Sequence, residues 1–140
     1  MRIMAIDYGD TRTGVAVSDE SLTLAGEAWV VQSKNMPETA RVITEEAAKR
    51  GVSCIVVGHP KNMNGSIGPR AEKSEQLAEL LHSLCDIAVE LWDERLTTMS
   101  AARILNETGS FGKKRKNTID AVAASIILED YLVYRARSNQ

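Results

Sequence analysis

Two hydrophobic periods alternate along the chain and predict its secondary structure. Residues 2–7 (RIMAID) are apolar at odd and even positions alike, which is typical of a central strand covered on both faces. Similar short apolar runs predict strands at residues 13–18, 27–32, 53–57 and 87–92. Apolar residues at helical spacing predict helices at residues 37–50, 69–84, 98–108 and 117–135.

The order of these elements predicts an α/β fold. Three consecutive strands form a meander, and a helix precedes each of the two later strands. This order is typical of a mixed five-stranded sheet with helices on both faces and right-handed crossovers. Residues 58–68 (GHPKNMNGSIG) are predicted to form a polar loop, and residues 109–116 a basic loop before the last helix. We expect residues 1–140 to form one domain.

Composition adds few constraints on the class of protein. The chain has 140 residues, of which 44% are hydrophobic and 26% are charged, with a formal net charge of −2. No apolar stretch approaches the roughly 20 residues of a membrane span, and the first residues do not resemble a signal peptide. Cys54 and Cys85 are expected to be buried free thiols in a reducing compartment. We therefore expect a cytoplasmic protein without membrane contacts.

Acidic residues stand where two of the predicted strands end. Asp7 ends the first strand, and Asp93 and Glu94 follow the fifth, in LWDERLTT. Ligand sites in open α/β sheets lie outside the carboxyl ends of strands, so parallel first and fifth strands would bring these acids together. Simpler explanations exist, since Asp7 suits a turn and the acid pair suits a solvated strand end beside Arg95. Alternation along the strand does not decide between Asp93 and Glu94.

The last predicted helix begins with a third acid, Asp120. It opens an apolar stripe that continues through Ala124, Ile127 and Tyr131. With Asn117 as the N-cap, Asp120 would lie in the first turn, where an acid stabilises free N–H groups and the helix dipole. Capping and function both explain this residue.

Together the three acidic positions predict a metal site. Carboxylates within a few ångströms of one another repel and raise each other's pKa. A divalent cation removes that cost, and oxygen ligands select a hard ion, Mg²⁺ or Mn²⁺. Such ions can activate a water molecule and stabilise the leaving oxygen in phosphodiester cleavage.

Basic and amide side chains near these acids are candidates for nucleic-acid contacts. The candidates are Arg12, Lys61, Asn62, Asn64, Arg70, Arg95, Lys113, Lys114, Arg115 and Lys116. Contacts of basic residues with phosphate are salt-sensitive and independent of base sequence. A solvated loop and a solvated charge run would explain the same residues without function. Aromatic residues make up 4% of the chain, so recognition through backbone and shape, of structured RNA or branched DNA, is favoured over base stacking.

Four segments of the chain resemble the signature blocks of the YqgF family. They are MAIDYGDTRTGVAVSD, VVGHPKNMNGSIGPRAEK, ELWDERLTT and KKRKNTIDAVAASIILEDYL, and together they span nearly the whole chain. Members of this family are RuvC-like and described as Holliday-junction resolvases, and they are also assigned as nucleases that mature the 5′ end of pre-16S ribosomal RNA. The resemblance implies a ribonuclease-H-like fold, in agreement with the predicted order of elements.

The resemblance also implies roles for individual residues. It implies catalytic, metal-binding acids at Asp7, Glu94 and Asp120, and so favours Glu94 over Asp93. His59 stands where the family more often has Leu, and we expect it on the loop surface, with substrate contact as the alternative. The implied activity is metal-dependent hydrolysis of structured nucleic acid. Processing of pre-16S rRNA is the leading function, and Holliday-junction resolution is the alternative.

Two further classes of function stay open at this point. The segment IDYGDTRTGVAV also resembles the phosphate-binding hairpin of the actin and sugar-kinase group. Those proteins place two such domains around one nucleotide, whereas 140 residues provide one. A non-catalytic, transcription-associated nucleic-acid-binding factor would share every feature except activity. The sequence leaves the oligomeric state open between monomer and homodimer.

Overall fold

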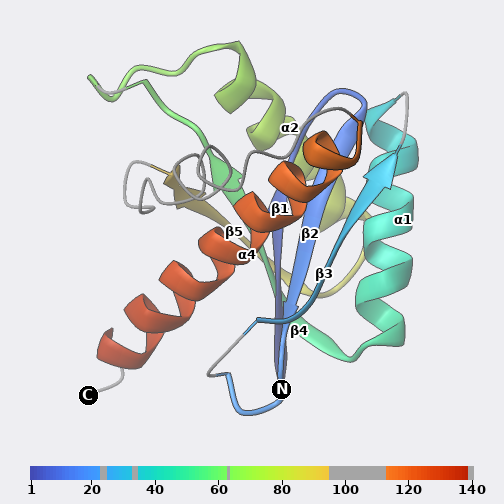
Figure 1. The fold of residues 1–140 in the computed structure, drawn as a ribbon, viewed down its shortest axis with the longest axis vertical. Helices are drawn as coiled ribbons and strands as arrows, with labels where there is room; N and C mark the ends of the chain where they lie inside the picture. The colour runs from blue at the N-terminus through green and yellow to red at the C-terminus, as the bar shows by residue number, and fades with distance from the viewer. Residues whose placement is uncertain (23–24, 33–34, 63, 95–112, 139–140) are drawn as a thin grey trace.

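One mixed sheet of five strands forms the centre of the molecule (Figure 1). The computed structural model describes residues 1–22, 25–32, 35–62, 64–94 and 113–138, with the backbone alone for residues 113–120. The strands are β1 (Arg2–Asp7), β2 (Arg12–Ser18), β3 (Ala25–Gln32), β4 (Val52–His59) and β5 (Ala88–Asp93). The described helices are α1 (Met36–Lys49), α2 (Pro69–Leu84) and α4 (Lys113–Ser138).

The directions of the strands place three strand ends at one edge of the sheet, whose order is β3-β2-β1-β4-β5. β1 runs antiparallel to β2, and β2 antiparallel to β3, as predicted for the meander. β1 runs parallel to β4, and β4 parallel to β5. The carboxyl ends of β1, β4 and β5 therefore lie at the same edge.

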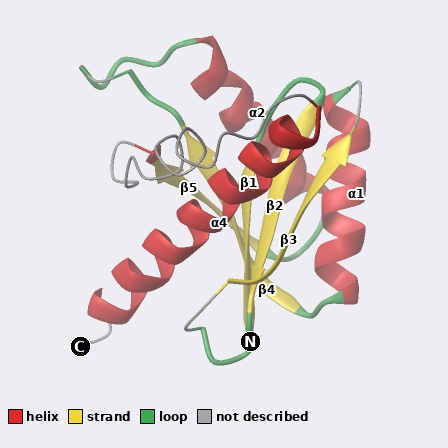
Figure 2. Ribbon diagram, viewed as in Figure 1, coloured by secondary structure: helices red, strands yellow, loops and turns green. Residues whose placement is uncertain are grey.

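Helices cover both faces of this sheet (Figure 2). On one face, Ile6 of β1 belongs to a buried cluster with Ile43 of α1 and Leu77 of α2. On the opposite face, Ala5 of β1 belongs to a second cluster with Ile127 of α4. Neighbouring residues of β1 thus enter different cores, as the period of two requires. The prediction of a mixed five-stranded sheet with helices on both faces is confirmed.

Helix α1 illustrates how local sequence fixes an element. Asn35 is its N-cap, and the Asn35 side chain accepts a hydrogen bond of 2.8 Å from the Glu38 backbone N–H. Pro37 lies in the first turn, where its missing N–H costs nothing. Gly51 follows the helix with a φ of +66°, a left-handed conformation that glycine adopts without strain. The chain then turns directly into β4.

The end of β4 differs from the prediction. Gly58 and His59 belong to the strand, because they pair with Trp92 and Asp93 of β5. They were predicted to start a loop, since Gly and His are poor signals for a strand. Pairing with a partner more than 30 residues away overrides that local preference.

The start of α4 also differs from the prediction. The helix begins at Lys113, so the basic run 113–116 lies in a helix rather than a loop, and Asn117 is not its N-cap. Lys and Arg have high helix propensity, and no Gly or Pro interrupts residues 113–138. The remaining predicted elements among the described residues agree with the structure to within two residues.

Three smaller expectations concern helices and thiols. The helix predicted at residues 98–108 lies outside the described residues. Among the described helices, none combines the length and the apolar character that crossing a bilayer requires. Cys54 is buried as predicted, Cys85 is only partly buried, and both are free thiols.

Candidate active site

Asp7 and Glu94 face the same side of the sheet. Ala5 in β1 lies in the cluster that packs against α4, so Asp7, two residues later, faces α4 as well. Trp92 of β5 lies in the same cluster, which places Glu94, two residues later, on that face. Because β4 alone separates β1 from β5, the two acids stand at one edge of the sheet, one strand apart.

Gly58 of β4 provides the space that the Glu94 side chain occupies. A Cβ atom added to Gly58 would lie 3.1 Å from Glu94 Cδ and 3.2 Å from Glu94 Oε2. The same atom would lie 2.8 Å from Ile127 Cδ1 of α4. The Glu94 carboxyl and the Ile127 side chain therefore meet over a strand position that has no side chain of its own.

The Glu94 side chain is half-buried, and its carboxyl oxygen Oε2 is fully buried and incompletely satisfied. Its Oε2 accepts no hydrogen bond from any residue in the described part of the chain. Burial raises the pKa of Glu94, the Arg70 charge opposes this rise, and the Asp93 charge adds to it. A buried acceptor without a donor is costly, and a bound cation would remove that cost.

Arg70 links the two acids electrostatically. Its Nη2 lies 3.9 Å from Asp7 Oδ1, and its charge opposes the rise in the pKa of Glu94. The Asp7 side chain is 13% exposed, whereas the Arg70 side chain is 70% exposed. An ion pair this long and this open to solvent contributes little to stability. The guanidinium is therefore free to contact a ligand that approaches the acids.

Asp120 belongs to α4, and its side chain lies outside the described residues. It is the eighth residue of the helix, counting Lys113 as the first. The helix-start explanation for this acid is therefore wrong, because capping and dipole effects are confined to the first turn. Ile127, which meets Glu94 over Gly58, follows Asp120 by seven residues, or about two helical turns. Among the described side chains, no three His, Cys, Asp or Glu groups form a metal-binding cluster.

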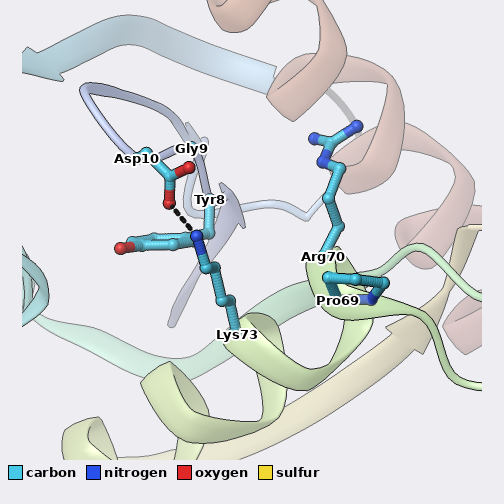
Figure 3. Close-up of a pocket in the computed structure, with 6 residues that line it drawn as sticks. All are labelled: Tyr8, Gly9, Asp10, Pro69, Arg70 and Lys73. Carbon is cyan, nitrogen blue, oxygen red and sulfur yellow. Dashed lines mark hydrogen bonds and ion pairs between the residues drawn. The ribbon is translucent and has the colours of Figure 1, made fainter.

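A pocket of about 250 Å³ lies between the β1–β2 turn and the start of α2 (Figure 3). Its lining residues are Tyr8, Gly9, Asp10, Pro69, Arg70 and Lys73. Lys73 Nζ donates a hydrogen bond of 2.7 Å to Asp10 Oδ1 across the pocket. The sequence prediction missed Lys73, although its position one helical turn after Arg70 was a usable signal.

The loop between β4 and α2 stands out from the body of the molecule at the upper left of Figure 1. Lys61, Asn62 and Asn64 were predicted in this loop as phosphate contacts. The Asn62 Nδ2 donates to Ser66 Oγ at 2.9 Å, and Asn64 Oδ1 accepts from Ser66 Oγ at 2.7 Å. These bonds close the loop on itself, so both amides shape the loop, while Lys61 remains a candidate contact.

His59 is buried and does not lie on a loop surface. Its side chain is 7% exposed, and its Nε2 lies 2.8 Å from Glu75 Oε2 of α2. The prediction was wrong because β4 continues through His59 and is covered by α2. Alternation from Gly58 directs His59 to the face opposite Asp7 and Glu94.

The structure describes the other predicted contact residues only in part. Arg12 begins β2, at the sheet edge where β1 ends. Arg95 lies outside the described residues. Lys113, Lys114, Arg115 and Lys116 form the first turn of α4, and only their backbone is described.

Comparison with known protein families gives one match over almost the whole chain. The model of the RuvX family, described as Holliday junction resolvase, matches residues 1–134. A protein of Halothermothrix orenii named "Putative pre-16S rRNA nuclease" is 48% identical over 136 residues, covering 96% of each chain. A protein of the same name from Caldanaerobacter subterraneus subsp. tengcongensis is 46% identical over 133 residues, covering 94% of this chain and 96% of that relative.

Solved structures with a similar fold include two resolvases. Thermus thermophilus RuvC in complex with Holliday junction substrate has a TM-score of 0.63 and 13% identity, covering 100% of this chain and 97% of that chain. Fowlpox virus resolvase, in complex with its substrate Holliday junction DNA, has a TM-score of 0.56 and 8% identity over all of both chains. At such low identity the likeness concerns the fold, and it confirms the ribonuclease-H-like class.

Proposed function

The chain belongs to the RuvX family of Holliday junction resolvases, and from this premise we propose that it is a metal-dependent nuclease that hydrolyses phosphodiester bonds in structured nucleic acid. The observation that carries the proposal is the Glu94 carboxylate, which lies against Gly58 of β4 and has a buried oxygen that no described residue satisfies. Asp7 faces the same side at the same sheet edge. Membership of this family supports a hydrolase acting on nucleic acid.

A divalent cation, Mg²⁺ or Mn²⁺, fits these residues. The donors are carboxylate oxygens, which hard cations prefer. Gly58 keeps space open beside the Glu94 carboxyl, and the unsatisfied Oε2 has no competing donor among the described residues. Asp7, Glu94 and Asp120 would hold the ion. When bound, such an ion makes a water molecule nucleophilic near neutral pH and stabilises the leaving oxygen.

The chain's own residues would position the substrate. Arg70 lies beside Asp7 and is exposed to solvent. Its planar guanidinium carries paired N–H donors that match the oxygens of a phosphate group. Lys61 lies on the protruding loop and would attract the phosphate backbone of the nucleic acid further from the cleavage site. Packing over Gly58, beside Ile127 of α4, would keep the Glu94 carboxyl in place. These roles rest on position and charge, so recognition of the backbone is favoured over recognition of bases.

The substrate we favour is pre-16S ribosomal RNA, cleaved near its 5′ end. The support is the name of relatives that share 41–48% identity with this chain over nearly their whole length. A four-way DNA junction is the second candidate. Its support is the description of the family and the similarity of the fold to that of RuvC in complex with a Holliday junction.

A cleavage assay with both substrates tests the proposal. Purified protein with Mn²⁺ or Mg²⁺ is given a 5′-extended 16S precursor RNA and a four-way DNA junction, in parallel. We expect cleavage of the RNA that stops when EDTA removes the metal. Asp7→Asn should reduce cleavage by at least about 100-fold while binding persists, because positioned metal chemistry carries most of the rate. Equal cleavage by parent and Asp7→Asn would overturn the mechanism, and cleavage of the junction alone would reverse the order of substrates.

A further inference from the structure

The pocket between the β1–β2 turn and α2 carries two cations at separate ends. Arg70 and Lys73 are one helical turn apart on α2, yet their side chains diverge (Figure 3). Arg70 extends to the acid site, where it lies 3.9 Å from Asp7. Lys73 reaches the opposite wall, where it meets Asp10. A chain of phosphates crossing this pocket would meet one cation after the other.

Arg70 connects the pocket with the acid site, because it lines the pocket and its Nη2 lies 3.9 Å from Asp7 Oδ1. Tyr8, which follows Asp7 in the chain, turns to the other face of the sheet and forms part of the wall. Gly9 forms the next part, and a Cβ there would lie 2.2 Å from the Arg12 carbonyl oxygen, so only glycine fits this tight turn. The tight turn at Gly9 thus fixes the shape of this part of the wall.

The Lys73–Asp10 pair is accessible and exchangeable. The Lys73 side chain is 45% exposed and that of Asp10 is 67% exposed. An ion pair this exposed contributes little to stability, so a phosphate can replace the carboxylate. A lysine amine is charged at neutral pH, and the hydrogen bond to Asp10 raises the pKa of Lys73 further.

We propose that this pocket binds the backbone phosphate adjacent to the one being cleaved, with Lys73 as its contact and Asp10 as an internal competitor. The inference rests on the proposed nuclease function. Without nucleic acid, the Lys73 amine donates its hydrogen bond to Asp10, which holds the amine at the pocket. With nucleic acid bound, the adjacent phosphate replaces Asp10 as the partner of the Lys73 amine. Arg70 then contacts the phosphate that is being cleaved, which lies at Asp7 and Glu94. Either RNA or DNA offers the phosphodiester group that this site recognises.

Opposite effects of mutating the two partners test this site. Binding of a labelled stem–loop RNA with a single-stranded 5′ extension, and of a labelled four-way DNA junction, is measured in EDTA so that no cleavage occurs. We expect Lys73→Gln to weaken binding roughly 3- to 10-fold and to lower the slope of log K against log salt by about 1. Asp10→Asn should leave binding unchanged or tighten it, because it frees the amine. Whichever probe responds identifies the type of backbone that uses the site.

A matched ion pair elsewhere supplies the control. Lys49 is 71% exposed and lies 3.7 Å from Glu46 on α1, so Lys49→Gln removes the same charge far from the pocket. If Lys73→Gln binds both probes as Lys49→Gln does, the proposed subsite is wrong. An equal loss of binding in Lys73→Gln and Asp10→Asn would also overturn the subsite, because an ion pair with a purely structural role is lost whichever partner is mutated. If the subsite alone is wrong, the parent still binds the probes, and its cleavage still depends on Asp7. No binding of either probe by the parent would overturn the nuclease function as well.

Discussion

At the scale of single residues, Glu94 has an environment that differs from that of an ordinary surface acid. It follows the edge strand β5, yet its carboxyl is buried against Gly58 and Ile127. One of its oxygens accepts no hydrogen bond from the described residues. Proteins keep such costly groups mainly where function needs them, and a cation site gives this one a purpose.

The buried Glu94 carboxyl predicts an unusual dependence of stability on pH. Burial raises its pKa, with Arg70 opposing and Asp93 adding to the rise. The folded protein therefore retains this proton to a higher pH than the unfolded chain, in which Glu has a pKa of about 4.3. By linkage, this group lowers the free energy of unfolding of the metal-free protein as pH rises from the unfolded pKa through the folded one.

Glu94→Gln removes this penalty. In EDTA at pH 7 we expect the variant to be more stable than the parent, with the advantage shrinking as the pH falls towards the unfolded pKa. Urea unfolding between pH 4 and pH 8 measures the difference. A variant that is less stable than the parent at pH 7, by an amount that grows with pH, would contradict the assignment of a buried, unsatisfied carboxyl.

At the scale of elements, β1 and α2 are the two that the sequence predicts to the residue. β1 is apolar on both faces and ends at the turn after Asp7. α2 starts at Pro69 and has its buried residues at helical spacing, among them Leu77 and Leu81. Each carries its start, end and periodicity within its own residues, so local rules suffice.

β4 and α4 needed information that local rules do not contain. The last two residues of β4 are Gly and His, and their strand form comes from pairing with β5. In α4 the helix extends four residues before the predicted start, through a basic run that the sequence predicts as the end of a glycine-containing loop. Charge says little about backbone conformation when the residues are good helix formers.

The contact between β4 and α4 gives a prediction at this scale. Gly58→Ala would place a Cβ 2.8 Å from Ile127 Cδ1 and about as close to the Glu94 carboxyl. We expect the variant to stay folded with a loss of about 1–3 kcal/mol in the free energy of unfolding. Displacement of Glu94 should also weaken Mn²⁺ binding, measured by calorimetry, by about 10-fold.

Gly26→Ala is the matched control for this change. Gly26 also lies in a strand, but an added Cβ would come no closer than 3.4 Å to any neighbouring atom. It should therefore retain the Mn²⁺ affinity of the parent. If Gly58→Ala binds Mn²⁺ as tightly as Gly26→Ala, the packing of Glu94 over Gly58 has no part in the site.

At the scale of the whole molecule, the sheet brings together acids that are far apart in sequence. The sequence places Asp7 at a strand end, but alternation alone leaves Asp93 and Glu94 equivalent. The fold separates them, because Glu94 faces α4 with Asp7 while Asp93 pairs with His59 and faces the other side. Only the register of β5 and the position of α4 make this choice, and neither is visible in the pattern of β5 itself. The resemblance to a family had favoured the same residue.

We infer that Asp7 and Glu94 form one metal site at this sheet edge. Calorimetric titration of Mn²⁺ into the parent, Asp7→Asn and Glu94→Gln tests it most directly. We predict binding by the parent and a loss of at least about 10-fold in affinity for each variant, since the loss of a ligand should cost no less than the loss of a residue that supports one. Thermal unfolding in EDTA checks that both variants are folded. Parent-like Mn²⁺ affinity in folded Asp7→Asn and Glu94→Gln would contradict the account.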